Sequence, residues 1–283
     1  MTADDPVVWV DGRLLATSAA RISPFDHGLL VGDGVFETLR VYAGVPFAWT
    51  RHHARLQRSA AGLGLEAPTT EVLRAATNSV LDANGLSDAR IRLTVTGGPA
   101  PLGSERGAAG PTVIVAASAM RPWPPTVRVV HAPWTRNEAS AVAGLKTTSY
   151  AENVRALAFA HERDGGEAIF ANTRGELCEA TGSNVFVVDD GVVRTPPPAA
   201  GCLLGVTRAL VLELCAAGGI TAEETTLARA TLGEADEAFL TSSTREVQAI
   251  SHVDDLALPA APGPTTAALA EAFADLVARD PDP

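Results

Sequence analysis

Lysine is almost absent from this chain of 283 residues: of its 22 basic side chains only Lys146 is a lysine, and the rest are arginines. Arginine therefore serves wherever a positive charge alone is needed. A lysine kept against this bias is expected to supply what arginine cannot, because a desolvated ε-amine loses its proton and attacks carbonyl groups, whereas a guanidinium stays charged. Such an amine can form a Schiff base. The alternative is that Lys146 is a surface lysine kept by chance.

The chain also lacks the features of secreted, membrane and nucleic-acid-binding proteins. Its N-terminus, Met1-Thr-Ala-Asp-Asp, is acidic without an apolar signal core, and no apolar run reaches membrane-spanning length. A net charge of −11 disfavours phosphate-rich partners. Cys178, Cys202 and Cys215 are odd in number and lack metal-ligand spacing, so we interpret them as reduced structural thiols. We expect a cytoplasmic protein with no metal site and no nucleic-acid or membrane partner.

The length favours two domains, and one segment is suited to link them. In Met120-Arg-Pro-Trp-Pro-Pro125, three prolines in five residues remove backbone donors and fix φ, which excludes a helix or a central strand. We therefore expect a small N-terminal α/β domain over residues 1–119, a linker over 120–126 and a larger domain over 127–283.

Hydrophobic periodicity predicts the elements of both halves. In the first half we expect a hairpin over 7–15 with a turn at Asp11-Gly12, helices over 51–63 and 71–84, and strands over 90–96 and 112–117. In the second half we expect strands over 127–131, 167–171, 176–180, 184–188, 192–194 and 237–241, and helices over 149–163, 206–217 and 265–279. Tyr150, Val154 and Leu157 should share one face of the helix over 149–163. Recurrent hairpins indicate an α+β fold in two layers.

The neighbourhood of Lys146 suits a Schiff-base lysine. It lies in Gly144-Leu-Lys-Thr-Thr-Ser-Tyr150, where we expect the chain to enter the helix that begins at Ser149. The positive end of a helix favours the neutral amine over the ammonium.

Glu179 is the second candidate, because a carboxylate in a mostly apolar strand needs a cationic partner. The protonated pyridine nitrogen of pyridoxal phosphate (PLP) is such a partner, and its protonation makes the cofactor an electron sink. The alternative is a salt bridge to one of the many arginines.

Three further segments offer groups for a phosphate. Gly205-Val206-Thr207 opens a helix after a proline-rich loop, and its free amides form an anion site. Ser242-Ser243-Thr244 follows a strand and offers hydroxyls and amides, and Arg55 could add a forked cation. Taken singly each signal is weak, because every helix has an N-terminus and most helical arginines face solvent.

Together these segments resemble the class IV aminotransferases, the fold-type IV group of PLP enzymes. The matching segments lie in family order over nearly the whole chain: Asp26-His-Gly-Leu-Leu-Val-Gly-Asp-Gly-Val-Phe-Glu-Thr-Leu-Arg40, His52-His-Ala-Arg-Leu56, Leu145-Lys-Thr-Thr-Ser-Tyr150, Glu179-Ala-Thr-Gly-Ser-Asn-Val-Phe186 and Leu204-Gly-Val-Thr-Arg208. The resemblance implies a two-domain α+β fold like that of D-amino-acid aminotransferase, and a homodimer with its site at the interface.

The resemblance also assigns roles to single residues. Lys146 would bind PLP covalently, and Glu179 would pair with the pyridine nitrogen. Tyr150 would lie near the cofactor ring. The phosphate would be held by Arg55, by the helix start at Gly205, Val206 and Thr207, and by Ser242 and Ser243.

The subfamily depends on the substrate residues. The carboxylate trap of D-amino-acid aminotransferases is missing, because its places are taken by Phe36, Leu102 and Ser104. Branched-chain aminotransferases place tyrosines where this chain has Val31 and Arg90.

Aminodeoxychorismate lyases favour a threonine at the position of Thr38, a cation near Arg92 and an arginine in the following loop, where Arg106 is available. Phe36, Arg92 and Arg106 are thus the expected substrate residues, and Thr38 joins Lys146 and Glu179 as catalytic. Arg106 could instead be a solvated loop residue, and Arg92 could pair with an acid.

The favoured interpretation is an aminodeoxychorismate lyase, which releases pyruvate and forms 4-aminobenzoate for folate synthesis. The main alternative is a transaminase that moves an amino group from an amino acid or (R)-amine to a keto acid. A protein that binds PLP without catalysis, or an oligomeric scaffold, is a third possibility, which the intact Lys146 and Glu179 disfavour.

Overall fold

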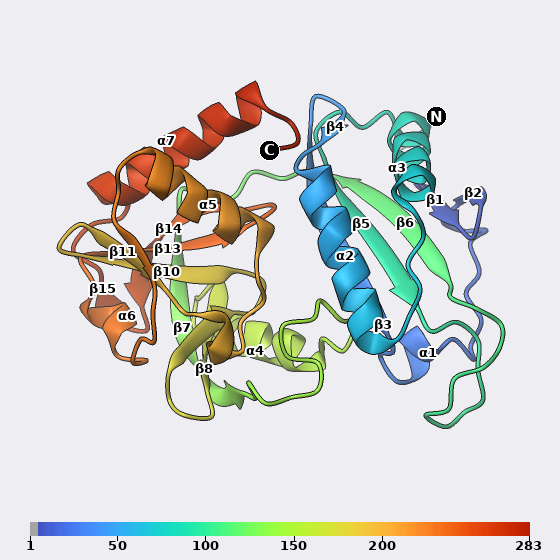
Figure 1. Cartoon of the computed structure of the whole chain (residues 1–283), viewed down its shortest axis with the longest axis horizontal. Helices are drawn as coiled ribbons and strands as arrows, with labels where there is room; N and C mark the ends of the chain where they lie inside the picture. Colours follow the sequence, from blue (N-terminus) through green and yellow to red (C-terminus); the bar gives the residue numbers. More distant parts are fainter. Residues whose placement is uncertain (1–4) are drawn as a thin grey trace. The chain divides into compact units, whose positions relative to one another are not determined.

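The computed structural model describes residues 5–283 and divides them into two compact units (Figure 1). The first unit contains the residues up to Arg121, Leu145–Tyr150 and Pro281–Pro283, and the second contains Pro122–Gly144 and Ala151–Asp280. The acidic residues 1–4 of the expected signal-free N-terminus lie outside the described residues.

The expected domain division is wrong for two segments, because residues 145–150 and 281–283 belong to the first unit. Main-chain pairing explains the first case: the Phe36 N–H donates to the Lys146 carbonyl (2.9 Å) and the Thr148 N–H donates to the Gly34 carbonyl (2.8 Å). In the second case, the Asp282 carboxylate accepts the Thr50 N–H (2.8 Å) at the start of a helix. Local periodicity does not report such distant pairing.

The first unit is an antiparallel sheet of six strands with the order β2-β1-β6-β5-β3-β4. Its strands are β1 (Val7–Val10), β2 (Arg13–Ala16), β3 (Gly34–Tyr42), β4 (Val45–Pro46), β5 (Ala89–Thr96) and β6 (Val113–Ala119). Its helices are α1 (His27–Leu30), α2 (Trp49–Leu63) and α3 (Thr70–Asn84). The predicted hairpin is confirmed, and Asp11 and Gly12 both have the positive φ (45° and 90°) of its primed turn.

The core of this unit lies between the sheet and helices α2 and α3 (Figure 1). β5 alternates as predicted, with Ile91 and Leu93 buried and Arg92 on the opposite face. β3 was not predicted, because Glu37 stands among the buried positions where an apolar residue would complete the alternation. Side chains of even-numbered residues of β3 therefore share the non-helical face with Arg92.

The second unit has a mixed sheet of nine strands with the order β12-β11-β10-β13-β14-β7-β8-β9, and β15 pairs with β14. Its strands are β7 (Thr126–Arg136), β8 (Glu167–Asn172), β9 (Leu177–Ala180), β10 (Asn184–Asp189), β11 (Val192–Thr195), β12 (Ala222–Glu224), β13 (Glu237–Ser242), β14 (Glu246–Val253) and β15 (Leu256–Ala257). Its helices are α4 (Ala151–His161), the 3₁₀ turn η1 (Pro198–Ala200), α5 (Val206–Ala217), α6 (Thr231–Glu234) and α7 (Pro264–Arg279).

Helices pack on this sheet through small and apolar side chains. Ala156 and Ala160 of α4 lie in one buried cluster with Val130, Ala168 and Phe170 of the sheet. Helices α5 and α7 pack on each other and on β13, and α7 also packs on β14 (Figure 1). The predicted face of α4 is wrong: Val154 is 64% exposed, because the small residues of α4 face the sheet instead.

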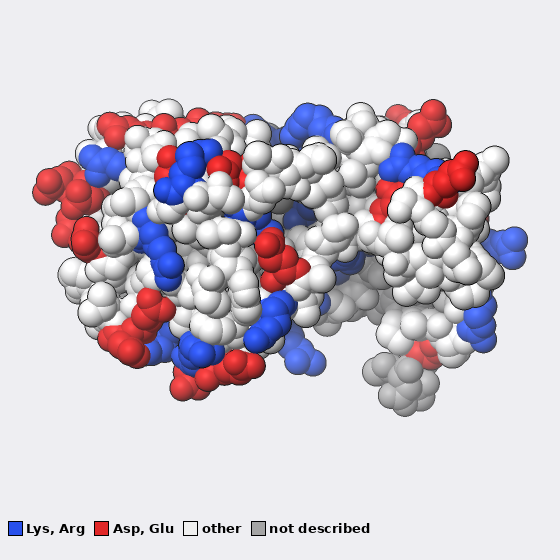
Figure 2. Space-filling view, turned by 90° about the horizontal axis from the view of Figure 1, so that it is seen from below, with Lys and Arg blue, Asp and Glu red and all other residues white. Residues whose placement is uncertain are grey.

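Other expectations from composition concern thiols and charge. The three cysteines are buried and form no disulfide. On the face drawn in Figure 2, basic and acidic side chains are interspersed among uncharged ones. Among the described residues, no helix has the length and hydropathy needed to span a membrane.

Candidate active site

Lys146 is held in the first unit by main-chain contacts. Its N–H donates to the Ser59 Oγ of α2 (3.1 Å), its carbonyl accepts from Phe36 of β3, and the next residue, Thr147, forms a β-bridge with Val35. The predicted influence of a helix end on Lys146 is wrong. Helix α4 begins only at Ala151, and the field of a helix terminus falls off within one turn. The lysine instead extends from a strand-like segment.

The Phe36 ring is the centre around which several predicted residues meet. The Lys146 Nζ lies 4.4 Å and the Arg92 Cζ 3.7 Å from its centroid, and the Tyr150 ring meets it edge-on at 5.4 Å. Burial lowers the pKa of Arg92, and the negative face of an aromatic ring partly offsets this by stabilising the charge. Thr38 is paired with Arg92 in the β3–β5 register. The structure therefore groups Lys146, Phe36, Tyr150, Arg92 and Thr38 in one region.

Arg55 lies in a buried network with two residues that sequence analysis missed. Its Nε and Nη2 donate to the two carboxylate oxygens of Glu37 (2.7 and 2.8 Å), and His52 Nδ1 lies 2.7 Å from Glu37 Oε2. Burial alone would raise the pKa of Glu37, but Arg55 and His52 outweigh it and hold that pKa well below its usual range. Burial lowers the pKa of His52, so the neutral imidazole donates its Nδ1–H to Glu37.

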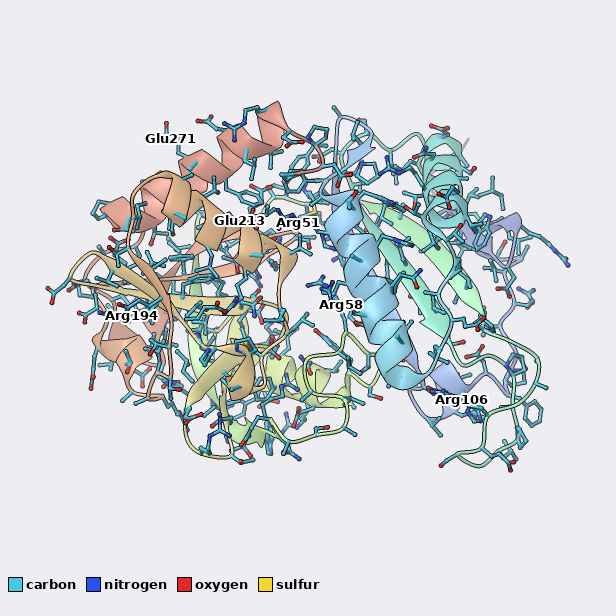
Figure 3. The ribbon with its side chains drawn as sticks, in the orientation of Figure 1. Arg51, Arg58, Arg106, Arg194, Glu213 and Glu271 are labelled. Carbon is cyan, nitrogen blue, oxygen red and sulfur yellow. The ribbon has the colours of Figure 1, made fainter. Side chains whose placement is uncertain are left out.

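Arg106 is engaged by an acid in the same unit. Its Nε and Nη2 donate to the Asp33 carboxylate (2.7 and 2.6 Å), and its Nη1 donates to the Gly64 carbonyl (3.1 Å). Figure 3 shows Arg106 at the end of α2 where Gly64 follows the helix. These bonds tie the loop after β5 to the Gly32-Asp33-Gly34 segment, so the fork expected to hold a substrate carboxylate is occupied by a protein carboxylate.

Glu179 lies on β9 of the second unit, with its side chain 14% exposed. One carboxylate oxygen accepts the Leu203 N–H (2.8 Å), and the other lies 3.6 Å from the Arg136 Nε. Arg136 also stacks on the Phe170 ring at 4.3 Å and donates to the Glu152 carboxylate. The salt bridge that remained open as an alternative for Glu179 is therefore present, and Arg136 is a residue that sequence analysis missed.

The predicted phosphate groups of the second unit lie at two chain turns. Helix α5 begins at Val206, and no side chain among the described residues caps its first turn. Gly205 is required there, because a Cβ at this position would overlap Asn184 Oδ1. Asn184 also donates its Nδ2–H to the Leu203 carbonyl (2.7 Å), so Glu179 and Asn184 together hold both polar groups of Leu203. Ser242 and Ser243 lie at the turn between β13 and β14.

Comparison with known proteins now identifies the family. The model of the class IV aminotransferases matches residues 34–253, which is most of the chain. The chain belongs to the class IV aminotransferase family. A D-alanine aminotransferase of Bacillus licheniformis is 33% identical over 92% of this chain and 93% of its own length. A branched-chain-amino-acid aminotransferase of Pseudomonas aeruginosa is 31% identical (98% and 94%), and an aminodeoxychorismate lyase of Bacillus subtilis is 30% identical (93% and 92%).

Solved structures of this class IV family confirm the predicted fold. The branched-chain aminotransferase of Thermoproteus uzoniensis with norvaline superposes with a TM-score of 0.91 at 32% identity, over 96% of this chain and 95% of that one. A branched-chain aminotransferase with pyridoxamine 5'-phosphate, from the source abbreviated T.th., gives a TM-score of 0.91 at 26% identity, over 98% and 96%. The chain is thus an α+β, fold-type IV, PLP-dependent enzyme.

The residues present fit PLP chemically. The cofactor needs an amine for its carbonyl, a carboxylate for its ring nitrogen and donors for its phosphate. The chain has one lysine in all, an anchored carboxylate at Glu179 and a helix start whose glycine cannot carry a Cβ without meeting Asn184. A backbone that a side chain cannot crowd allows an anion to approach the amides closely.

Proposed function

We propose that this class IV enzyme is a transaminase for amino acids that carry one carboxylate beside an apolar side chain. The single observation that carries this proposal is the unequal state of the two expected substrate arginines. Arg92 stacks on Phe36 close to Lys146, whereas the fork of Arg106 is taken by Asp33. One arginine beside an aromatic ring suits a monocarboxylate with an apolar side chain.

The proposed roles follow from the chemistry of each group. Bound PLP supplies an electron sink for the pair left when a substrate bond breaks. The Lys146 Nζ holds the cofactor and, once released, takes a proton from the substrate α-carbon and returns it. Glu179 keeps the ring nitrogen protonated, and Leu203 and Arg136 keep its carboxylate ionised and oriented. Phe36 and Arg92 orient the substrate, and Tyr150 lies against the ring.

Phosphate binding is proposed for residues of both units. Arg55, the helix start at Gly205, Val206 and Thr207, and Ser242 and Ser243 would hold the phosphate. Glu37 orients Arg55 by its two bonds to the guanidinium. Because charged hydrogen bonds are the strong ones, Arg55 would contribute most to retaining the cofactor.

Aminodeoxychorismate cleavage is the second candidate, favoured by Thr38. Its position opposite Arg92 puts a hydroxyl beside the cation on the non-helical face of the first unit. In this reaction Thr38 and Lys146 would move the protons that accompany loss of the enolpyruvyl group as pyruvate. Arg92 and Arg106 would hold the two carboxylates, which requires Arg106 to leave Asp33.

We also propose that the enzyme acts in the cytoplasm as a homodimer with its site at the interface. The support is a group of apolar side chains around α1 of the first unit that are about half exposed or more: Phe25, Leu29, Val31 and Leu102. Apolar groups of this kind mark interaction surfaces.

The test uses the single lysine. Purified protein is loaded with PLP, reduced with borohydride and digested, and the cofactor mass should be found on the peptide that contains Lys146. Loaded enzyme is then given branched-chain, aromatic and D-amino acids with a keto acid, and separately aminodeoxychorismate. We expect amination of the keto acid; pyruvate release from aminodeoxychorismate without amination would favour the lyase.

Lys146→Arg is the matched control, because it keeps the charge and the length but cannot become a neutral nucleophile at working pH. The variant should fold, bind some PLP without a covalent bond and show no turnover. Full activity in Lys146→Arg would contradict the proposed function.

A further inference from the structure

Glu167, at the start of β8, is a buried carboxylate with no role in the proposed chemistry. Its side chain is 5% exposed and accepts hydrogen bonds from the Thr181 Oγ, the Gly182 N–H (3.1 Å) and the Ser183 Oγ (3.1 Å). These three donors form the turn between β9 and β10. The turn begins just after Glu179 and Ala180 and ends at Asn184, so Glu167 fixes the chain between two residues that hold Leu203.

The partner of Glu167 is Arg245, which belongs to the turn that carries Ser242 and Ser243. Its Nε lies 3.2 Å from Glu167 Oε1, and its Nη2 donates to the Gly166 carbonyl (3.1 Å). Its N–H donates to the Ser242 Oγ (3.2 Å). The Arg245 side chain is only 6% exposed, so both charges of this pair are removed from water.

The other contacts of Arg245 leave its guanidinium little freedom. Its Nη1 donates to Gln248 Oε1, and its Cζ lies 3.7 Å from the centroid of the Trp123 ring. Gln248 in turn donates to the Pro124 carbonyl (2.6 Å). A guanidinium held on its edge and on its face transmits the position of one turn to the other.

Burying an ion pair is costly, and apolar residues of similar volume often stabilise a fold as well or better. A buried pair that satisfies the hydroxyls and an amide of one turn is therefore better explained by geometry than by stability. We propose that Glu167 and Arg245 are a positioning pair for the cofactor: they fix the turn beside Glu179 relative to the turn of Ser242 and Ser243. This inference rests on the proposed cofactor roles of Glu179 and of the two serines.

Glu167→Gln tests the pair, and Glu237→Gln is its matched control. Glu237 is also the first residue of a strand, is also buried, and caps α7 by accepting the N–H groups of Thr265 and Thr266 (3.0 and 2.8 Å). Its carboxylate thus serves a helix start instead of the two turns, and it reports the structural cost of losing a buried carboxylate in the same unit.

Three quantities are measured on each protein: the melting temperature without cofactor, the dissociation constant of PLP, and the visible circular dichroism of the bound cofactor. Both variants should melt at a lower temperature than the unsubstituted enzyme. Only Glu167→Gln should weaken PLP binding, by at least about tenfold, the scale of one charge-assisted hydrogen bond, and change the dichroism. A purely structural role would leave the last two quantities unchanged.

Ser183→Ala keeps the test decisive if Glu167→Gln does not fold. It removes one donor from the turn and leaves the ion pair intact, so PLP binding should weaken by about threefold with altered dichroism. Equal PLP affinity and dichroism in Ser183→Ala, Glu237→Gln and the unsubstituted enzyme would overturn the positioning role alone. An unsubstituted enzyme that takes up no PLP would overturn this role together with the proposed function.

Discussion

Replacing Arg55 with alanine should have two separable effects, because the side chain has a structural partner and a proposed ligand. Its Nε and Nη2 are bonded to both oxygens of Glu37, and Glu37 is fully buried. The variant leaves that carboxylate to the neutral imidazole of His52. The same change removes the cation proposed to hold the phosphate.

The two magnitudes differ in origin. Removing one partner of a buried ion pair costs about 3–5 kcal/mol of folding stability, because the other charge remains desolvated. At about 2 °C per kcal/mol for a domain of this size, the melting temperature without cofactor should fall by at least about 6 °C. Loss of a charged hydrogen bond to the phosphate, about 1.5–3 kcal/mol, should weaken PLP binding by about tenfold to a hundredfold.

Glu37→Gln separates the effects, because it breaks the same buried pair but keeps Arg55. Both variants should melt early in scanning calorimetry of the cofactor-free protein. Only Arg55→Ala should lose at least about tenfold in PLP affinity by fluorescence titration, and excess PLP should restore most of its activity. Equal losses of affinity in both variants would refute a direct phosphate contact, and unchanged melting in both would refute the buried pair.

Three further substitutions test other parts of the site. Glu179→Gln should keep PLP bound but lower turnover by at least about tenfold, since it weakens the electron sink; lower affinity with normal turnover at saturation would reassign it to structure. Arg106→Ala should leave single-carboxylate transamination within about twofold and lower any aminodeoxychorismate cleavage by at least about tenfold, both followed by product analysis. Because the pKa of Glu37 is depressed, its stabilisation is present above about pH 4.3, the ordinary glutamate pKa, and is lost below it. Urea melts from about pH 6 to about pH 3 should therefore show a shallower loss of stability for Glu37→Gln.

Local patterns predicted the elements whose two faces differ clearly in polarity. β5 is the best case, because its alternation also placed Arg92 on the face that carries Phe36. β3 escaped prediction because Glu37 occupies a buried position, and that carboxylate is tolerated only through Arg55 and His52 on a different element. A pattern that scores polarity one residue at a time does not contain this compensation.

The candidate site was predicted as a set of residue types, while its connections were not. Lys146, Glu179 and Arg55 were found from their chemistry and their motifs. Their holding partners were missed because they lie far away in sequence: Asp33 is 73 residues from Arg106. The same holds for Arg136 beside Glu179, whose position on β7 becomes informative only when the β7–β8–β9 pairing is known.

These partners refine the argument from composition. Arginine does more in this chain than supply charge, because Arg55, Arg245 and Arg106 each use two or three guanidinium nitrogens on separate acceptors. A lysine ammonium is a single point of charge and would satisfy such a set only in part. The positions that need a forked cation therefore exclude lysine for geometric reasons, while the proposed position of covalent chemistry excludes arginine for chemical ones. The lone lysine and the multiply bonded arginines follow from the same difference between an amine that can lose its proton and a guanidinium that keeps it.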